Sequence, residues 1–94
     1  MLLPGKEYAY LYVVALAEAN KLEFPLSKSG FLYHIETHIQ HTFQAKPRAI
    51  RYYDTKVLYN WLQEAMPNNI FKRDVPKDVL CERIDEVEEN RGKS

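Results

Sequence analysis

GFLYHIETHIQHTFQAKPRAIRYYD, residues 30–54, is the stretch in which a helical pattern gives way to a basic and aromatic one. In its first half, apolar side chains recur at the three- and four-residue spacing of a helix that buries one face. This spacing predicts a helix over residues 31–43. Its buried stripe is expected to consist of Leu32, Ile35, Ile39 and Phe43.

Residues that begin or end helices mark the limits of this segment. Ser29 suits the N-cap position, where a hydroxyl accepts a hydrogen bond from a backbone N–H, and Ser27 is the alternative. Pro47 lacks an amide hydrogen, so it either ends a helix or stands in the first turn of a new one. A short helix over residues 47–53 is therefore compatible with the sequence.

Three further helices are predicted outside this segment. Residues 6–20 are apolar on nearly every side of the helix, a pattern found where a helix is buried in a core or in an oligomer interface. Because so short a chain has little else to cover this helix, we expect a homodimer that forms through it. The other two helices are expected over residues 55–66, with Asp54 as N-cap, and over residues 76–90, with Asp74 as the capping residue.

These patterns favour an all-α fold, a small domain of four to five helices that includes a helix-turn-helix. The alternative is an α+β fold with a small two- or three-stranded sheet, because short alternating or aromatic runs occur at residues 22–26, 49–53 and 70–73. The 94 residues fit one domain, residues 1–94, in which residues 91–94 are expected to form a loose tail.

Charge and cysteine content limit the function. Thirteen Lys and Arg balance thirteen Asp and Glu, which argues against a protein that coats nucleic acid nonspecifically. The charges are separated along the chain, since residues 44–56 are basic and residues 78–89 are acidic. A single cysteine, Cys81, excludes an internal disulfide bond and a metal site built from several cysteines. No apolar run reaches the about 20 residues of a membrane-spanning helix, so we expect a cytoplasmic protein without a membrane partner.

The three histidines, His34, His38 and His41, are expected on one face of the helix over residues 31–43, opposite its apolar stripe. His34 and His38 are four residues apart, a spacing at which two imidazoles can hold a metal ion. His41 lies too far along the helix axis to complete a compact site, so neither a metal nor a cofactor is assigned. A solvated face and a pH-sensitive contact with a protein partner are the other interpretations.

The second half of the segment has the composition of a nucleic-acid contact. Lys46, Arg48 and Arg51 supply positive charge that can bind phosphates. Tyr52 and Tyr53 can stack on bases or donate hydrogen bonds to phosphates. These five residues form the candidate nucleic-acid site.

A helix-turn-helix is the arrangement in which these side chains would meet DNA. The turn would be residues 44–46, and the second helix, beginning at Pro47, would direct Arg48 and Arg51 toward a major groove. In the alternative, the segment is a surface loop whose arginines pair with the acidic C-terminal segment of the same or a neighbouring molecule. Docking of these arginines on an acidic protein is a third interpretation.

The sequence KPRAIRYYD, residues 46–54, resembles the P-R-x-I-R-Y-Y-D/E stretch of the MerR-type regulators. In that family the stretch forms the recognition helix and the start of the wing, so the resemblance implies DNA binding by this segment. The resemblance is local. Gln44 stands where the family has a turn glycine, and residues 56–58 are Lys-Val-Leu where the family has Gly-Leu-Leu.

No arrangement of catalytic residues is recognised, so we expect a protein that is not an enzyme and has no small-molecule substrate. Cys81 lies among acids, which disfavour a thiolate, and neither a nucleophile elbow nor a glycine-rich phosphate loop is present. The leading hypothesis is a small transcription regulator that binds DNA through residues 31–53. The alternative is a protein-interaction module, such as a phage or plasmid inhibitor or adaptor. It would act on a host protein through its His34/His38/His41 face, its exposed tyrosines or its acidic C-terminal helix.

Overall fold

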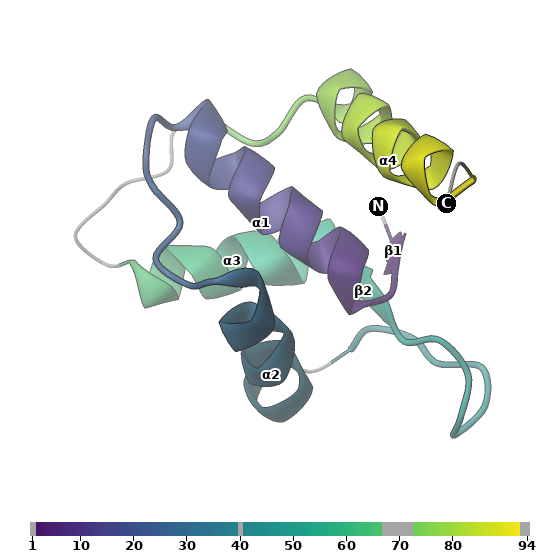
Figure 1. Ribbon diagram of the computed structural model, residues 1–94. Coiled ribbons are helices and arrows are strands. Elements are labelled where there is room, and N and C mark those ends of the chain that lie inside the picture. The colour runs from purple at the N-terminus through teal and green to yellow at the C-terminus, as the bar shows by residue number, and fades with distance from the viewer. Residues whose placement is uncertain (1, 40, 67–72, 93–94) are drawn as a thin grey trace.

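The computed structural model describes residues 2–39, 41–66 and 73–92. Within these residues the chain forms four helices and one two-stranded sheet, so the prediction of a mostly helical domain is confirmed (Figure 1). The small sheet was expected only in the α+β alternative. The elements in chain order are β1 (Leu2–Pro4), α1 (Lys6–Ala19), α2 (Lys28–His38), β2 (Tyr52–Asp54), α3 (Thr55–Ala65) and α4 (Lys77–Gly92).

Helix α1 is the centre of the domain. It packs against each of the other three helices and against both strands, and its end residues were predicted to within one position. The buried side chains of α1 are Tyr8, Ala9, Tyr12, Val13, Ala15, Leu16 and Ala17. Much of a helix that is apolar on nearly every side is thus covered by its own chain, while Tyr10, Leu11 and Val14 are half-buried. The homodimer through this helix stays a prediction, but the lack of cover that motivated it largely does not apply.

Helix α2 begins and ends earlier than the sequence pattern predicts. It starts at Lys28 because Ser27, in an extended conformation, accepts a hydrogen bond from the backbone N–H of Gly30 at 3.2 Å. Ser27 is therefore the N-cap, and the expectation for Ser29 was wrong. The helix ends at His38, and Ile39 is already extended.

The early end of α2 has a cause outside the helix. Thr42 and Phe43 donate backbone hydrogen bonds to the carbonyl oxygen of Tyr52 at 2.8 and 3.2 Å, and Tyr52 donates to the carbonyl oxygen of Phe43 at 2.7 Å. Backbone groups committed to this pairing cannot also continue a helix. The expected helix over residues 31–43 is therefore replaced, after His38, by a chain that turns toward β2.

The short helix expected over residues 47–53 does not form. Pro47 and Arg48 lie in a turn, and β2 follows, pairing antiparallel with β1 so that Tyr53 is opposite Leu3. Tyrosine and isoleucine favour extended conformations, and the strand pairing adds hydrogen bonds that a single helical turn lacks. The helix-turn-helix is consequently not confirmed, and the segment that resembles the MerR recognition helix is a turn and a strand here.

The remaining expectations are confirmed in part. Helix α3 is confirmed, with Asp54 as an N-cap that accepts from the backbone N–H of Lys56 at 3.0 Å. Residues 22–26 are not a strand, β2 overlaps the end of residues 49–53, and the strand proposed at 70–73 lies mostly outside the described residues. Helix α4 continues through Gly92, so the loose tail could only be residues 93–94, which the structure does not describe.

Helix α4 is attached to α1 by polar contacts at both of its ends. Near its start, the Tyr12 hydroxyl donates to Asp74 Oδ1 at 2.5 Å, and the backbone N–H of Val75 donates to the same oxygen at 2.7 Å. Near its end, the Tyr8 hydroxyl donates to Glu88 Oε1 at 2.9 Å. Asp74 precedes the helix by three residues, so it fixes the entry of the chain into α4 and is not the cap that was expected.

We expect Asp74→Ala to lower the free energy of unfolding by about 1–3 kcal/mol, because the Tyr12 hydroxyl, on a side chain only 1% exposed, loses its acceptor. Tyr12→Phe removes the donor instead, and the double variant should cost less than the sum of the two single variants. Urea denaturation measures these values, with the exposed Asp85→Ala on α4 as the control. Additive costs would contradict a direct contact.

The same contact predicts a dependence on alkaline pH. Burial first, and then the hydrogen bond to Asp74, raise the pKa of the Tyr12 phenol above its ordinary value. The unfolded chain therefore releases this proton at lower pH than the folded one, and the stabilisation is lost as pH rises above about 10. Tyr12→Phe should show a smaller fall in stability over that range.

Candidate nucleic-acid interface

Residues 42–52 form a hairpin, called here the basic hairpin, which projects from the helices at the lower right of Figure 1. Its base is closed by the pairing of Phe43 with Tyr52, and the Thr42 hydroxyl accepts from the backbone N–H of Asp54 at 3.0 Å. On the other side of the base, the N–H of Gly5 donates to the carbonyl oxygen of Arg51 at 2.9 Å. The hairpin therefore leaves the domain in one fixed direction.

The tip of the basic hairpin is stabilised by one side chain. The Gln44 amide donates to the carbonyl oxygens of Pro47 at 3.2 Å and Ala49 at 2.8 Å. The backbone N–H of Ala49 also donates to the carbonyl oxygen of Lys46 at 3.0 Å. Gln44, which replaces a turn glycine in the MerR resemblance, thus holds the turn that presents Arg48.

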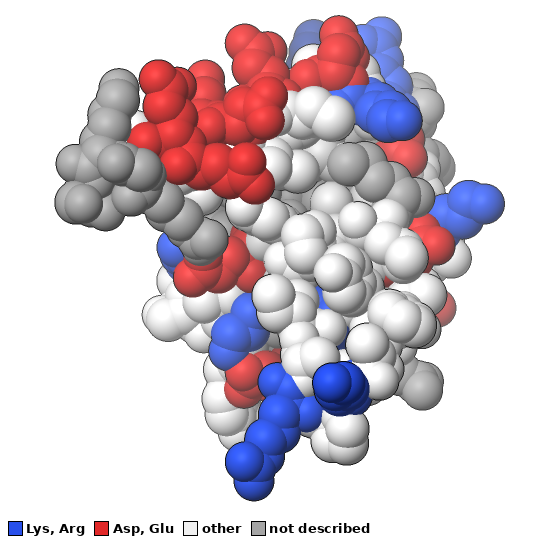
Figure 2. Space-filling model, turned by 90° about the vertical axis from the view of Figure 1, so that its right-hand side faces the viewer, with Lys and Arg blue, Asp and Glu red and all other residues white. Residues whose placement is uncertain are grey.

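The positive charges of the basic hairpin point to solvent. Lys46, Arg48 and Arg51 are all exposed, and residues 42–52 contain no Asp or Glu. In the described part of the chain, neither Lys46 nor Arg48 forms an ion pair. On the side of the molecule drawn in Figure 2, basic side chains lie at the lower end and most acidic ones gather in the upper part, where further basic side chains lie beside them.

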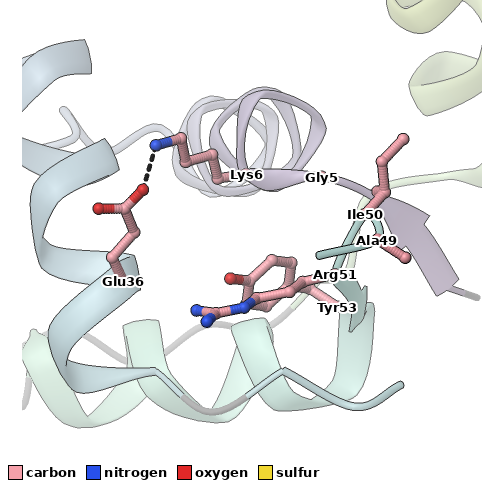
Figure 3. Close-up of a pocket in the computed structure, with 7 residues that line it drawn as sticks. All are labelled: Gly5, Lys6, Glu36, Ala49, Ile50, Arg51 and Tyr53. Atoms are coloured by element: carbon pink, nitrogen blue, oxygen red, sulfur yellow. Dashed lines mark hydrogen bonds and ion pairs between the residues drawn. The ribbon is translucent and has the colours of Figure 1, made fainter. Parts of the chain in front are cut away.

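Arg51 lies beside a groove of about 570 Å³ between the hairpin, the start of α1 and helix α2 (Figure 3). In this groove Lys6 forms an ion pair with Glu36. Lys6, chiefly by its hydrogen bond, lowers the pKa of Glu36, and the nearby Arg51 lowers it further. The charge of Arg51 is therefore partly balanced, which leaves Lys46 and Arg48 as the least compensated cations of the hairpin.

The two tyrosines of the candidate site have different environments. Tyr53 is 2% exposed and belongs to the core, so its ring is not at the surface where a DNA contact was expected. Tyr52 is half-buried, and its ring centroid lies 5.9 Å from that of Phe43. A strand alternates the sides to which successive residues point, so only one tyrosine of the pair could face inward fully.

The sequence did not predict that two apolar residues of the hairpin are exposed at the surface. Phe43 was expected in the buried stripe of a helix, but Phe43 is 51% and Ile50 is 60% exposed. Their spacing fits a helix, and only the pairing of Phe43 with Tyr52 shows that the helix is not formed. The role of Gly5 and Lys6 as neighbours of Arg51 had no signal in the sequence.

The histidines do not form one stripe. His34 and His38 stack, with ring centroids 4.2 Å apart and planes 8° apart, while His41 lies beyond the end of α2. His34 also lies against Trp61, at 5.3 Å between ring centroids. Desolvation, and then the neighbouring His38, lower the pKa of His34. Among the described residues, no group of three or more His, Cys, Asp or Glu side chains could hold a metal ion.

No protein-family model, curated protein or solved structure matches this chain. The function must therefore be argued from its own residues. None of the helices in the described ranges combines the length and the apolar character needed to cross a membrane.

Proposed function

We propose that this protein is a small, non-enzymatic regulator that binds DNA through the basic hairpin. The observation that carries the proposal is the fixed projection of Lys46 and Arg48, exposed and without an ion-pair partner among the described residues, from a hairpin that contains no acidic residue. Exposed cations of this kind gain affinity for DNA by releasing the counterions that phosphates hold.

The hairpin suits DNA without a recognition helix. The major groove of B-DNA admits a two-stranded ribbon as well as an α-helix. In this proposal Lys46 and Arg48, at the tip, contact phosphates or base edges, and Arg51 contacts a phosphate nearer the domain. Tyr52, half-buried at the base, contributes to the shape of the hairpin and not to base stacking. Tyr53 is no longer part of the proposed interface.

The test is binding to a mixed-sequence DNA duplex by fluorescence anisotropy across a salt series. Lys46→Ala/Arg48→Ala should weaken binding about 10–100-fold near 0.1 M salt, and should reduce the slope of log K against log salt by about 2. The matched control is Lys28→Ala/Lys77→Ala, which removes two exposed lysines away from the hairpin. If wild type fails to bind at low salt, or if both double variants lose the same affinity, the proposal is wrong.

A protein-interaction module is the second candidate, because Tyr33 is 70% exposed on α2 beside the stacked His34 and His38. Exposed tyrosine is frequent in protein interfaces. A host protein that bound this surface would lose affinity for Tyr33→Ser, while Lys46→Ala/Arg48→Ala would leave that affinity unchanged. The two candidates therefore predict opposite effects for the same pair of variants.

A further inference from the structure

We propose that two copies of this chain associate face to face, with the basic hairpin of each copy docked on the acidic side of α4 in the other. The acidic side of α4 is the set of exposed carboxylates Asp78, Glu82, Asp85, Glu86, Glu88 and Glu89. This interface differs from a dimer through α1, because much of α1 is covered within one chain.

The two surfaces have opposite charges on a chain with no net charge. The chain carries as many Lys and Arg as Asp and Glu, so two copies do not repel each other at long range. The basic hairpin has no acid, and every Asp and Glu of α4 is exposed. The one arginine of α4 whose side chain is described, Arg83, is paired with Glu18 of α1. The local charges therefore favour contact between unlike ends of two copies.

Both surfaces belong to the same face of the molecule. Figure 2 shows acidic side chains gathered at the upper end of this face, with basic ones beside them at the top, and basic side chains at the lower end next to acidic ones. Specific contacts connect the two ends, since Ile50 of the hairpin lines a groove of about 220 Å³ with Pro4, Gly5 and Tyr8. The Tyr8 hydroxyl in turn donates to Glu88 of α4.

This layout is self-complementary. Consider a two-fold axis that lies in the plane of the face and runs at right angles to the line joining its upper and lower ends. This axis places the upper end of each copy on the lower end of the other, so the same contact forms two times. Apolar side chains are also available for an interface, because Leu2 of β1 and Ile50 of the hairpin are both exposed. An interface of standard size needs only about 800 Å² from each partner, a modest part of the 6506 Å² of accessible surface that the chain has.

The association would cover Lys46 and Arg48, so it would compete with the proposed binding of DNA. It does not depend on that function, because the contact is between protein surfaces alone. We expect wild type to be a dimer at about 0.1 mM protein and about 0.05 M salt, and a monomer at about 0.5 M salt, where charges are screened within a few ångströms. Sedimentation equilibrium measures the mass at both salt concentrations.

Charge exchange between the two surfaces provides the decisive test. Lys46→Glu/Arg48→Glu makes the hairpin acidic, and Asp85→Lys/Glu89→Lys makes the end of α4 less acidic. The hairpin variant alone should be monomeric at low salt, because both contacts of its dimer place like charges together. The α4 variant alone should dimerise more weakly than wild type, because two of its six carboxylates are replaced by cations. A mixture of the two should dimerise more readily than the hairpin variant alone, because the basic hairpin of one copy then meets an unchanged acidic α4 and the acidic hairpin of the other meets an α4 end that carries two lysines.

Several results would overturn the proposal. These are a wild type that is monomeric at low salt, variants that dimerise as wild type does, a mixture that stays monomeric, or a mass that grows without limit as an open chain would. Circular dichroism checks that each variant is folded, and Lys46→Gln/Arg48→Gln replaces the acidic hairpin variant if that one is not. DNA binding separates the two proposals, since Asp85→Lys/Glu89→Lys should weaken the dimer but should not weaken DNA binding, which the uncovered hairpin and the added positive charge favour.

Discussion

Tyr53→Ala is expected to lower the free energy of unfolding by about 3–5 kcal/mol, the range found when a large buried aromatic side chain is removed. Tyr53 is 2% exposed and lies opposite Leu3, which is fully buried, in the pairing of β2 with β1. A chain of this size is expected to have a total stability of only about 5–14 kcal/mol. The variant should therefore lose a large share of the total stability, as measured by urea denaturation.

Tyr52→Ala is the matched control, because it removes the same side chain one position earlier on the same strand. Tyr52 is half-buried and contacts Phe43, which is itself exposed. We expect its loss to cost less than half as much as the loss of Tyr53. Equal costs for the two variants would show that the side of the strand facing the core has been assigned incorrectly.

Phe31→Ala is expected to lower the free energy of unfolding by a similar amount, about 3–5 kcal/mol. Phe31 is fully buried at the centre of an aromatic cluster, with ring centroids of Tyr10 and Phe24 at 5.7 Å and that of Trp61 at 5.6 Å. The cluster joins α1, α2 and α3 with the segment between α1 and α2. The loss of Phe31 therefore weakens the contacts of α2 with α1, with α3 and with the segment between α1 and α2 at once.

Phe31→Leu separates the ring contacts from the buried volume. It retains much of the apolar side chain, so its cost should be well below that of alanine and should include the about 0.5–1.5 kcal/mol per aromatic pair that ring geometry adds. Trp61 fluorescence and circular dichroism should report the same transition in urea. A Phe31→Ala variant as stable as wild type would place the centre of the core elsewhere.

The sequence predicted the elements whose signals are local. Helices α1 and α3 have apolar patterns and boundary residues within their own segments. The hydrogen bond from the backbone N–H of Lys56 to the Asp54 cap is also local, because it joins residues two positions apart. The end of α2 was not predictable in this way, because it depends on the pairing of Phe43 with Tyr52. Strand β1 depends likewise on β2, with which it shares no local pattern.

The candidate site was also predictable only in part. Charged side chains are almost always at the surface, so Lys46, Arg48 and Arg51 were expected to be exposed and are. Tyrosine occurs in cores and at surfaces alike, so residue type alone does not tell whether Tyr52 or Tyr53 is buried. That depends on which side of strand β2 faces the core, and the sequence pattern had predicted a helix at these residues. The burial of Tyr53 follows from that strand.

Strand β1 also limits how copies of this protein can meet. Within the described residues it pairs only with β2, so its outer edge offers backbone groups to which a foreign strand could add. It is only three residues long and ends in Pro4, and short edge strands with proline are a common protection against such addition. Ordered aggregation by strand addition is thus disfavoured, whereas the association proposed between the basic hairpin and α4 uses side chains and is expected to be reversed by salt.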